Sequence, residues 1–334
     1  MYERQRLGRA APDAKMALVD VIAVYSSHPS APLSLHARAA TFDATAFRRL
    51  PTVRLPAMRG SIHVLPEKTG HLAFRALPEA PARSARRLRN AGISDARYAE
   101  LRAAVLDAAA KPVPARALST ALDVEESLTP VLRAMTHEGV LVRVGATGLR
   151  SNELLWGAAE VPEADPDEAL AWLAGEYLRA FGPVRVADFA WWTGTTKGRA
   201  KAALAEHETE ELDGGLLLRA QDVEAFERAT PPRGAVDLIP KWDPIAMGWA
   251  PDGRGRFADD AVLPRLYEGR DQGGATTGDS LPMVLVDGEA VGTWSVRAGD
   301  GDELETTVDL FDKPTPNVRR ALDERLAEVR ALLA

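Results

Sequence analysis

The sequence contains no cysteine, which excludes disulfide bonds, thiolate zinc sites and cysteine nucleophiles together. No stretch approaches the ~18 uninterrupted apolar residues that a membrane-spanning helix needs. The N-terminal segment also lacks an apolar run followed by a small-residue cleavage site. We therefore expect a soluble protein of a reducing compartment, the cytoplasm by default, with no membrane partner.

Sequence motifs typical of metal-binding and nucleotide-binding sites are also missing. Four of the histidines lie in the first 71 residues, but they show no zinc-ligand spacing on a helix and no accompanying carboxylate cluster (His28, His36, His63 and His71). No glycine-rich phosphate loop or dinucleotide fingerprint is present, which excludes an ATPase and a dehydrogenase. The sequence thus predicts neither a metal nor a cofactor.

Acidic residues are scarce in the first third of the chain, although the whole protein carries a net charge of −7. Residues 1–110 hold 17 Lys or Arg against 9 Asp or Glu, a balance of +8, which leaves −15 for the other 224 residues. Four arginines of this basic third lie close together without an acid between them (Arg83, Arg86, Arg87 and Arg89). Such a cluster neutralises DNA phosphates, and the alternative is a solvated surface.

A repeat is the strongest signal that is present. Residues 112–118 (Pro-Val-Pro-Ala-Arg-Ala-Leu) and 183–189 (Pro-Val-Arg-Val-Ala-Asp-Phe) share a Pro-Val start and a later apolar position. A longer helix is predicted before each copy, over 95–109 after a cap near Ser94 and over 166–181.

Each copy is then followed by a second predicted helix and by segments with a strand-like sequence pattern. The second helices are predicted over 128–138 and about 197–206, and the strands over 139–144 and 215–219. Helix, turn, helix and strand pair is the winged-helix plan, and residues 1–80 fit a more diverged version of it. The remaining text predicts a small β-barrel or sandwich, with an Asp-Gly hairpin at 287–288, turns and a mobile loop over 252–279, and a helix over about 316–333.

The predicted fold class is α+β, with tandem winged helices before the small barrel. At 334 residues the chain is too long for one module, and we expect four units. They are an N-terminal unit with the active-site loop, a second and a third winged helix, and a C-terminal barrel with its helix, over 1–93, 94–160, 165–228 and 235–334.

Four landmarks carry a family resemblance over nearly the whole chain. They are 58–66 (Met-Arg-Gly-Ser-Ile-His-Val-Leu-Pro), 188–194 (Asp-Phe-Ala-Trp-Trp-Thr-Gly), 242–244 (Trp-Asp-Pro) and 286–294 (Val-Asp-Gly to Val-Gly-Thr-Trp). In this order they resemble the AlkZ-like, or YcaQ-type, winged-helix DNA glycosylases. The resemblance implies a concave DNA-binding face and the excision of N-alkylated bases or the unhooking of interstrand crosslinks.

The chemistry of that reaction makes modest demands on the protein. An N-alkylated purine is already cationic, so the enzyme has only to hold a water at the anomeric carbon and stabilise an oxocarbenium-like sugar. In the family a Gln-x-Gln motif, or a variant with one Gln, has this role. Here Tyr25 and Ser27 stand where the resemblance places the two glutamines, followed by His28.

Three interpretations of this departure stay open. Ser27 and His28 position the water, with Tyr25 stacking or hydrogen bonding; or the site is inactive and the protein only binds; or the alignment of the loop is shifted by a residue. The predicted catalytic residues are Tyr25, Ser27 and His28. A histidine before proline is also commonly a loop residue with a satisfied hydrogen bond.

Residues 59–63 form the second group of candidates. Arg59 is predicted to contact phosphate and His63 to place a polar group near the lesion, with Ser61 between them. On a strand these alternate positions share a face, unless Gly60 interrupts the phase; the alternative is a purely structural wing. Trp191, Trp192, Asp243 and Trp294 are predicted to be structural, as is the ring of Trp242.

We expect one partner, double-stranded DNA with alkylated or crosslinked bases, bound by a monomer in the nucleoid. The activity predicted is that of a monofunctional DNA glycosylase. The alternative is a non-catalytic winged-helix DNA-binding or regulatory protein, since neither glutamine is present.

Overall fold

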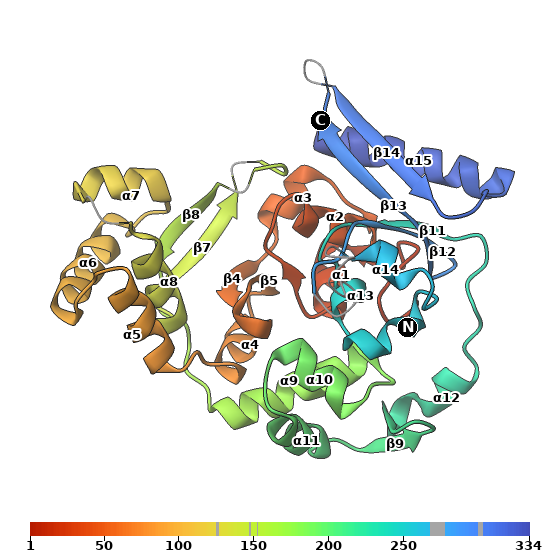
Figure 1. Ribbon diagram of the computed structural model, residues 1–334, viewed down its shortest axis with the longest axis horizontal. Helices are drawn as coiled ribbons and strands as arrows, with labels where there is room; N and C mark the ends of the chain where they lie inside the picture. Colours follow the sequence, from red (N-terminus) through yellow and green to blue (C-terminus); the bar gives the residue numbers. More distant parts are fainter. Residues whose placement is uncertain (125–126, 147, 152, 268–277, 300–302) are drawn as a thin grey trace.

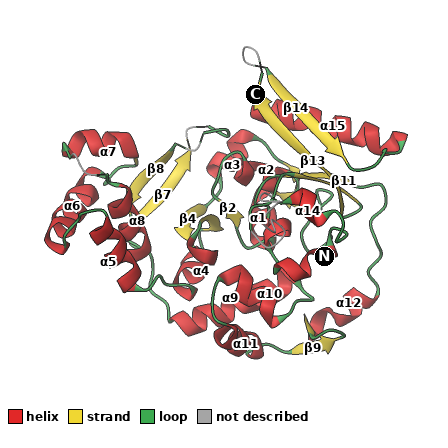
Figure 2. Ribbon diagram, in the orientation of Figure 1, coloured by secondary structure: helices red, strands yellow, loops and turns green. Residues whose placement is uncertain are grey.

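A computed structural model describes residues 1–124, 127–146, 148–151, 153–267, 278–299 and 303–334. Helices and small open sheets are mixed along the chain, in agreement with the α+β prediction (Figures 1 and 2). In Figure 1 the N-terminal elements occupy the middle, and the second, third and C-terminal groups lie around them. No helix of the described part is long and apolar enough to cross a membrane.

The N-terminal unit alternates short strands and short helices. Its elements are β1 (Ala11–Asp13), α1 (Ala14–Asp20), β2 (Val24–Tyr25), α2 (Ser30–His36), β3 (Ala39–Thr41), α3 (Ala44–Arg49), β4 (Thr52–Pro56), the 3₁₀ turn η1 (Met58–Gly60), β5 (Ile62–Pro66) and α4 (Gly70–Ala76). Two aspartates fix where α1 and α3 begin, because the carboxylates of Asp13 and Asp43 accept hydrogen bonds from backbone N–H groups of the first turn. The helix α2 was not predicted from the sequence.

From residue 95 onward the second unit has the helices and strands that the repeat predicts. It begins with an additional helix, α5 (Pro81–Asn90), which was not predicted and lies within the range 1–93 that the sequence assigned to the first unit. Its other elements are α6 (Asp95–Ala108), β6 (Val113–Pro114), α7 (Ala115–Leu122), α8 (Thr129–Glu138), β7 (Leu141–Ala146) and β8 (Leu154–Ala158). Ser94 caps α6 as predicted, accepting a hydrogen bond from the N–H of Arg97. Gly139 ends α8 with a left-handed φ of 80°, which a residue without a side chain adopts readily.

One six-stranded sheet joins the first two units, in the order β2-β5-β4-β7-β8-β6. A single residue pair, Arg54 and Arg143, links β4 to β7 among the described residues. Directly opposed residues run across all six strands and share one face of the sheet. This row is Val24, Val64, Arg54, Arg143, Trp156 and Val113.

From α9 (Pro166–Phe181) to β10 (Leu216–Arg219) the third unit resembles the part of the second unit from α6 to β8. Between these two elements lie α10 (Val186–Thr193), α11 (Lys197–Ala205) and β9 (Thr209–Leu212), and after them come η2 (Ala220–Asp222) and α12 (Val223–Glu227). Val113 pairs with Trp156 in the second unit, and Val184 makes an isolated bridge with Leu217 in the third. The two Pro-Val segments therefore mark equivalent places, where the chain crosses back to the last strand of a hairpin.

The C-terminal region departs from the predicted barrel. It contains β11 (Val236–Ile239), α13 (Pro244–Met247), η3 (Pro251–Arg256), α14 (Leu263–Leu266), β12 (Met283–Val286), β13 (Glu289–Ala298), β14 (Leu304–Leu310) and α15 (Pro316–Leu333). Its described strands form an open sheet in the order β11-β12-β13-β14. Closure is not needed, because α15 covers the sheet and shares a core with it through Leu322, Leu326 and Val329.

Other predictions for this region have mixed outcomes. The hairpin at Asp287 and Gly288 is confirmed by the pairing of β12 with β13, and the terminal helix is confirmed by α15. The strand β14 was not predicted. In the segment predicted as turns and a mobile loop, η3 and α14 are helical, and residues 268–277 lie outside the described part.

The units do not share one hydrophobic core equally. The largest core combines residues of the N-terminal, third and C-terminal parts, among them Leu55, Tyr177 and Trp249. The second unit has a core of its own, which includes Leu88 of α5 and Trp156 of β8. The fully buried ion pair between Arg38 and Asp243, 2.6 Å apart, ties α2 to the start of α13 and supports the prediction that Asp243 is structural.

Candidate active site and nucleic-acid interface

The loop that carries the predicted catalytic residues begins at the end of β2. Tyr25 is the last residue of this strand and lies opposite His63 on β5. After Tyr25 the N–H of Ser26 donates to the carbonyl of Ile62, which holds the loop against the sheet for one more residue. Tyr25, Ser27 and Ser61 are therefore positioned by neighbouring strands of one sheet.

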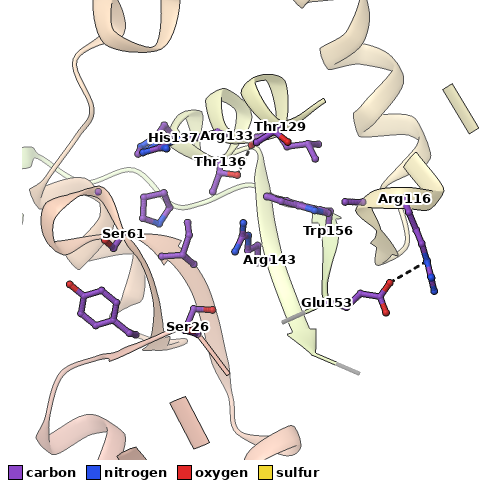
Figure 3. A pocket seen from close by; sticks show the side chains of 17 residues that line it. Ser26, Ser61, Arg116, Thr129, Arg133, Thr136, His137, Arg143, Glu153 and Trp156 are labelled. Carbon is purple, nitrogen blue, oxygen red and sulfur yellow. Dashed lines mark hydrogen bonds and ion pairs between the residues drawn. The ribbon is translucent and has the colours of Figure 1, made fainter. Parts of the chain in front are cut away.

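A cavity of about 700 Å³ opens between the first two units (Figure 3). One wall comes from the N-terminal unit and includes Tyr25, Ser27 and Ser61. The other wall comes from α8, β7 and β8 and includes Arg133, Arg143 and Trp156. In Figure 3 Arg143 lies near the centre of the view, between Ser61 on one side and Trp156 on the other.

A second cavity, of about 540 Å³, shares Tyr25 and Ser61 with the first. Its other walls include Arg59, Trp242 and Asp279. Trp242 was expected to be buried, but it is only partly so, and its ring centroid lies 6.1 Å from that of Tyr25. Tyr25 and Ser61 thus stand on the boundary between an arginine-lined cavity and an aromatic one.

Tyr25 has an uncharged phenol at neutral pH. Burial raises the pKa of its hydroxyl, while the positive charge of Arg59 and a hydrogen bond with Ser61 act in the opposite direction. The ring of Tyr25 packs at 4.4 Å, centroid to centroid, from the imidazole of His63. At this position Tyr25 offers a hydroxyl and an aromatic face but no charge.

His63 is buried and neutral. Burial lowers its pKa to about 4, and its hydrogen bond to the Ser61 carbonyl opposes that shift. The Nδ1 atom lies 2.9 Å from this carbonyl oxygen, which can only accept, so the proton of the neutral ring sits on Nδ1. His63 supports the backbone of Ser61 and the ring of Tyr25 from beneath.

His28 does not join Tyr25 and Ser27 at these cavities. It is buried, and its Nδ1 donates to the carbonyl of Leu149 at 3.1 Å while its ring contacts Phe47 edge to face. Burial lowers its pKa to about 4. His28 lines neither of the two cavities. This placement agrees with the alternative of a loop histidine with a satisfied hydrogen bond.

Arg59 lies in the turn η1 and not on a strand, so the predicted strand alternation with His63 is wrong. Its backbone has a left-handed φ of 57°, and the following Gly60 has one of 69°. The guanidinium carbon lies 4.5 Å from the centroid of the Trp191 ring, which gives this otherwise exposed side chain a fixed place. Arg59 still borders the second cavity beside Ser61.

The four clustered arginines lie on α5, but an acid outside the stretch neutralises part of their charge. Glu79 accepts from Arg87 at 2.6 Å and lies 3.7 Å from the side chain of Arg83. Arg86 and Arg89 are exposed, and neither has a carboxylate partner among the described residues. The sequence cluster therefore contributes two fully available charges and not four.

Three further arginines were missed by the sequence reasoning. Arg54 and Arg143 lie on β4 and β7, and Arg133 lies on α8. A signal was available, since Arg54 and Arg143 each interrupt apolar strand text at positions where an inward side chain is expected. The described residues hold no group of three His, Asp or Glu suited to a metal ion.

Comparison with known proteins identifies the family. Residues 21–332 match the family described as DNA glycosylase AlkZ-like. The chain therefore belongs to the AlkZ-like DNA glycosylases, DNA-repair enzymes that bind DNA and hydrolyse N-glycosidic bonds.

A solved structure shares the fold. The DNA glycosylase AlkZ of Streptomyces sahachiroi superposes with a TM-score of 0.71, over 99% of this chain and 94% of that one, at 22% sequence identity. At this identity the likeness concerns the fold alone. None of the curated proteins compared with the chain matched it.

Proposed function

We propose that the protein is a monofunctional DNA glycosylase that excises N-alkylated purines or unhooks crosslinked ones from double-stranded DNA. The observation that carries this proposal is the position of Tyr25 and Ser61 on the boundary of the two cavities. One cavity is lined by arginines and suits a phosphate backbone, while the other has the aromatic rings that suit a base.

The electrostatics support this restriction to alkylated bases. Tyr25 is uncharged, and His63 and His28 are neutral at pH 7, so none of the three is a strong proton donor to a leaving base. A cationic, N-alkylated purine needs no such donor, because its glycosidic bond already breaks toward a neutral leaving group. Ser27 and Ser61 then supply the hydroxyls that hold water near the sugar.

The two repeated units are proposed to be winged helices, and the four-unit division of the chain stays a prediction. From α6 to β8 the second unit has the order helix, strand, helix, helix, strand, strand. The third unit has this order from α9 to β10, with the isolated bridge of Val184 in place of the first strand, and both observations support the assignment. We further propose that the protein acts as a monomer on the cytoplasmic nucleoid, where its substrate lies.

An excision assay tests the proposal. Purified protein is incubated with duplex DNA that contains a single N7-methylguanine or a nitrogen-mustard crosslink, and abasic sites are then cleaved and counted. We expect abasic product from the wild type, and a loss of about 100-fold in single-turnover rate for Ser27→Ala, because a displaced water is poorly aligned for attack.

The matched control is Ser295→Ala, which removes a hydroxyl from β13 in the C-terminal sheet and should leave the rate unchanged. Absence of abasic product at high enzyme excess on both substrates would overturn the proposal and favour the non-catalytic DNA-binding alternative. Excision that is equally fast in Ser27→Ala would remove Ser27 from the site while leaving the activity in place.

A further inference from the structure

A buried arginine and a half-buried one lie side by side where the sheet joins the first two units. Arg54 on β4 and Arg143 on β7 are directly opposed in the antiparallel pair, so their side chains leave the same face of the sheet. Arg54 is only 6% exposed, and Arg143 is half-buried. Arg143 and its neighbour in the same row, Trp156, both line the 700 Å³ cavity, which therefore opens over this face.

Neither arginine has an ion-pair partner in the part of the chain that the structure describes. The Nε atoms of both are buried without a hydrogen-bond partner there. Elsewhere in the protein the fully buried Arg38 is held by Asp243 at 2.6 Å. A buried guanidinium without a carboxylate loses hydration and receives no compensating attraction.

The charges also act against one another. Burial first, and the neighbouring charge of Arg143 second, lower the pKa of Arg54 to about 10. Burial likewise lowers the pKa of Arg143, with Arg133 as the second cause. All three remain protonated at neutral pH. Arg143 and Arg133 line the cavity, and Arg54, which does not line it, lies directly beside Arg143 in the sheet.

The geometry of the group is partly preset. The guanidinium carbon of Arg143 lies 4.9 Å from the centroid of the Trp156 ring, which holds the side chain at the cavity wall. Arg133 reaches the same cavity from α8 (Figure 3). Planar guanidinium groups bind a tetrahedral phosphate through paired N–H donors, and an anion would offset the repulsion as well as the burial.

We propose that Arg143 and Arg133, assisted by the buried charge of Arg54 beside Arg143, form the binding site for one phosphate group, that of a phosphodiester in the DNA strand that crosses the cavity. The assignment to DNA rests on the proposed function, whereas the phosphate site itself does not. Tyr25 and Ser61 line the same cavity, so the phosphate would hold the strand beside them.

A methylphosphonate scan tests the DNA assignment. Neutral methylphosphonates replace the phosphates around the lesion one at a time, and duplex binding is measured by titration. The wild type should lose about tenfold or more in affinity when the methylphosphonate is at one particular position. Arg54→Met and Arg143→Met should show no loss at that position, and should bind the unmodified duplex about as weakly as the wild type binds the modified one. Arg320→Gln, an exposed arginine of α15, is the matched control and should keep the wild-type sensitivity.

Inorganic phosphate tests the site without DNA. At matched ionic strength, phosphate should raise the melting temperature of the wild type by about 2 °C or more relative to chloride, through preferential binding to the folded state. Arg54→Met and Arg143→Met should lose this shift. Both variants should melt no lower than the wild type in chloride, because methionine fills the space without an unpaired charge.

The outcomes separate the two proposals. A flat methylphosphonate scan with a phosphate shift that depends on the arginines would make the site one for free phosphate and overturn the DNA assignment. If neither measurement responds to the arginines, the phosphate site is wrong, even where excision is observed. If the scan and the shift behave as expected and no abasic product forms, the site stands and the proposed activity fails.

Discussion

The second and third units of the protein have similar helices and hairpins, but they differ in whether their buried charges are paired. In the repeat, Leu118 and Phe189 occupy corresponding positions, and both are fully buried. One position earlier the second unit has Ala117 and the third has Asp188, a fully buried carboxylate. Asp188 accepts from the N–H and the guanidinium of Arg185 and from the N–H of Ala250.

The hairpins extend this contrast. In the second unit β7 carries Arg143, which faces a cavity without a carboxylate partner among the described residues. In the third unit β9 carries the exposed acids Glu210 and Glu211. Under the proposed phosphate site, the second unit binds an anionic ligand, whereas the third unit, with its buried charge paired, serves as scaffold.

Removal of Asp188 should have the largest effect on stability. In Asp188→Ala, the N–H of Ala250 loses its acceptor, and the half-buried Arg185 and Arg256 each lose a carboxylate partner. We expect a loss of about 3 kcal/mol in the free energy of unfolding, measured by urea titration.

The control for that variant is Asp252→Ala, which removes the exposed carboxylate from the other side of Arg185. It should cost less than about 1 kcal/mol, as exposed ion pairs commonly do. Equal losses in the two variants would show that the third unit does not depend on its buried carboxylate, and the contrast between the units would then be one of surface charge only.

A pH titration of stability should show the next largest effect. The pKa of His63 is about 4 in the folded protein against an ordinary value of 6.5, so the unfolded chain binds more protons between these two values. This contribution to stability is complete above pH 6.5 and is lost as the pH falls toward 4, at about 1.4 kcal/mol per pH unit.

Comparison with His63→Gln isolates the histidine from titrating carboxylates. The loss of unfolding free energy between pH 6.5 and 4.5 should be smaller in the variant by about 3 kcal/mol at most. Parallel losses in the two proteins would mean that His63 is not neutral in the folded state. The N-terminal unit would then carry an additional positive charge beside Tyr25 at mildly acid pH.

The smallest effects should come from the arginines of α5. Arg86→Gln and Arg89→Gln should each make the plot of log affinity for duplex DNA against log salt concentration shallower by at most about 0.9. Arg87→Gln should change the slope less, because Glu79 already neutralises that side chain. A larger change for Arg87 than for Arg86 would show that DNA displaces Glu79, and the ion pair would then be part of the interface.

Much of the fold was predictable because it depends on local patterns. The long helices α6 and α9 follow from their caps and apolar stripes, and the Pro-Val repeat predicted the order of elements in two units. The pairing of β4 with β7 was not predictable, since it joins segments almost ninety residues apart through a single residue pair. The open C-terminal sheet depends likewise on β14 and on the packing of α15.

The candidate site was only partly predictable for the same reason. Local sequence singled out Tyr25, Ser27 and Ser61, and these residues lie near one another because β2 and β5 are neighbours in the sheet. It did not separate His28 from them, since the side chain turns toward Leu149 in another unit. Arg54 and Arg143 acquire significance only when two distant strands bring them together.

The neutrality of Tyr25 and His63 has a consequence for selectivity. A site without a strong proton donor leaves ordinary bases in place even when they enter it, because an uncharged purine must be protonated before it departs. Discrimination would then reside in the reactivity of the damaged nucleotide more than in the shape of the cavity. Under the proposed function, weak catalysis is itself the safeguard that spares undamaged DNA.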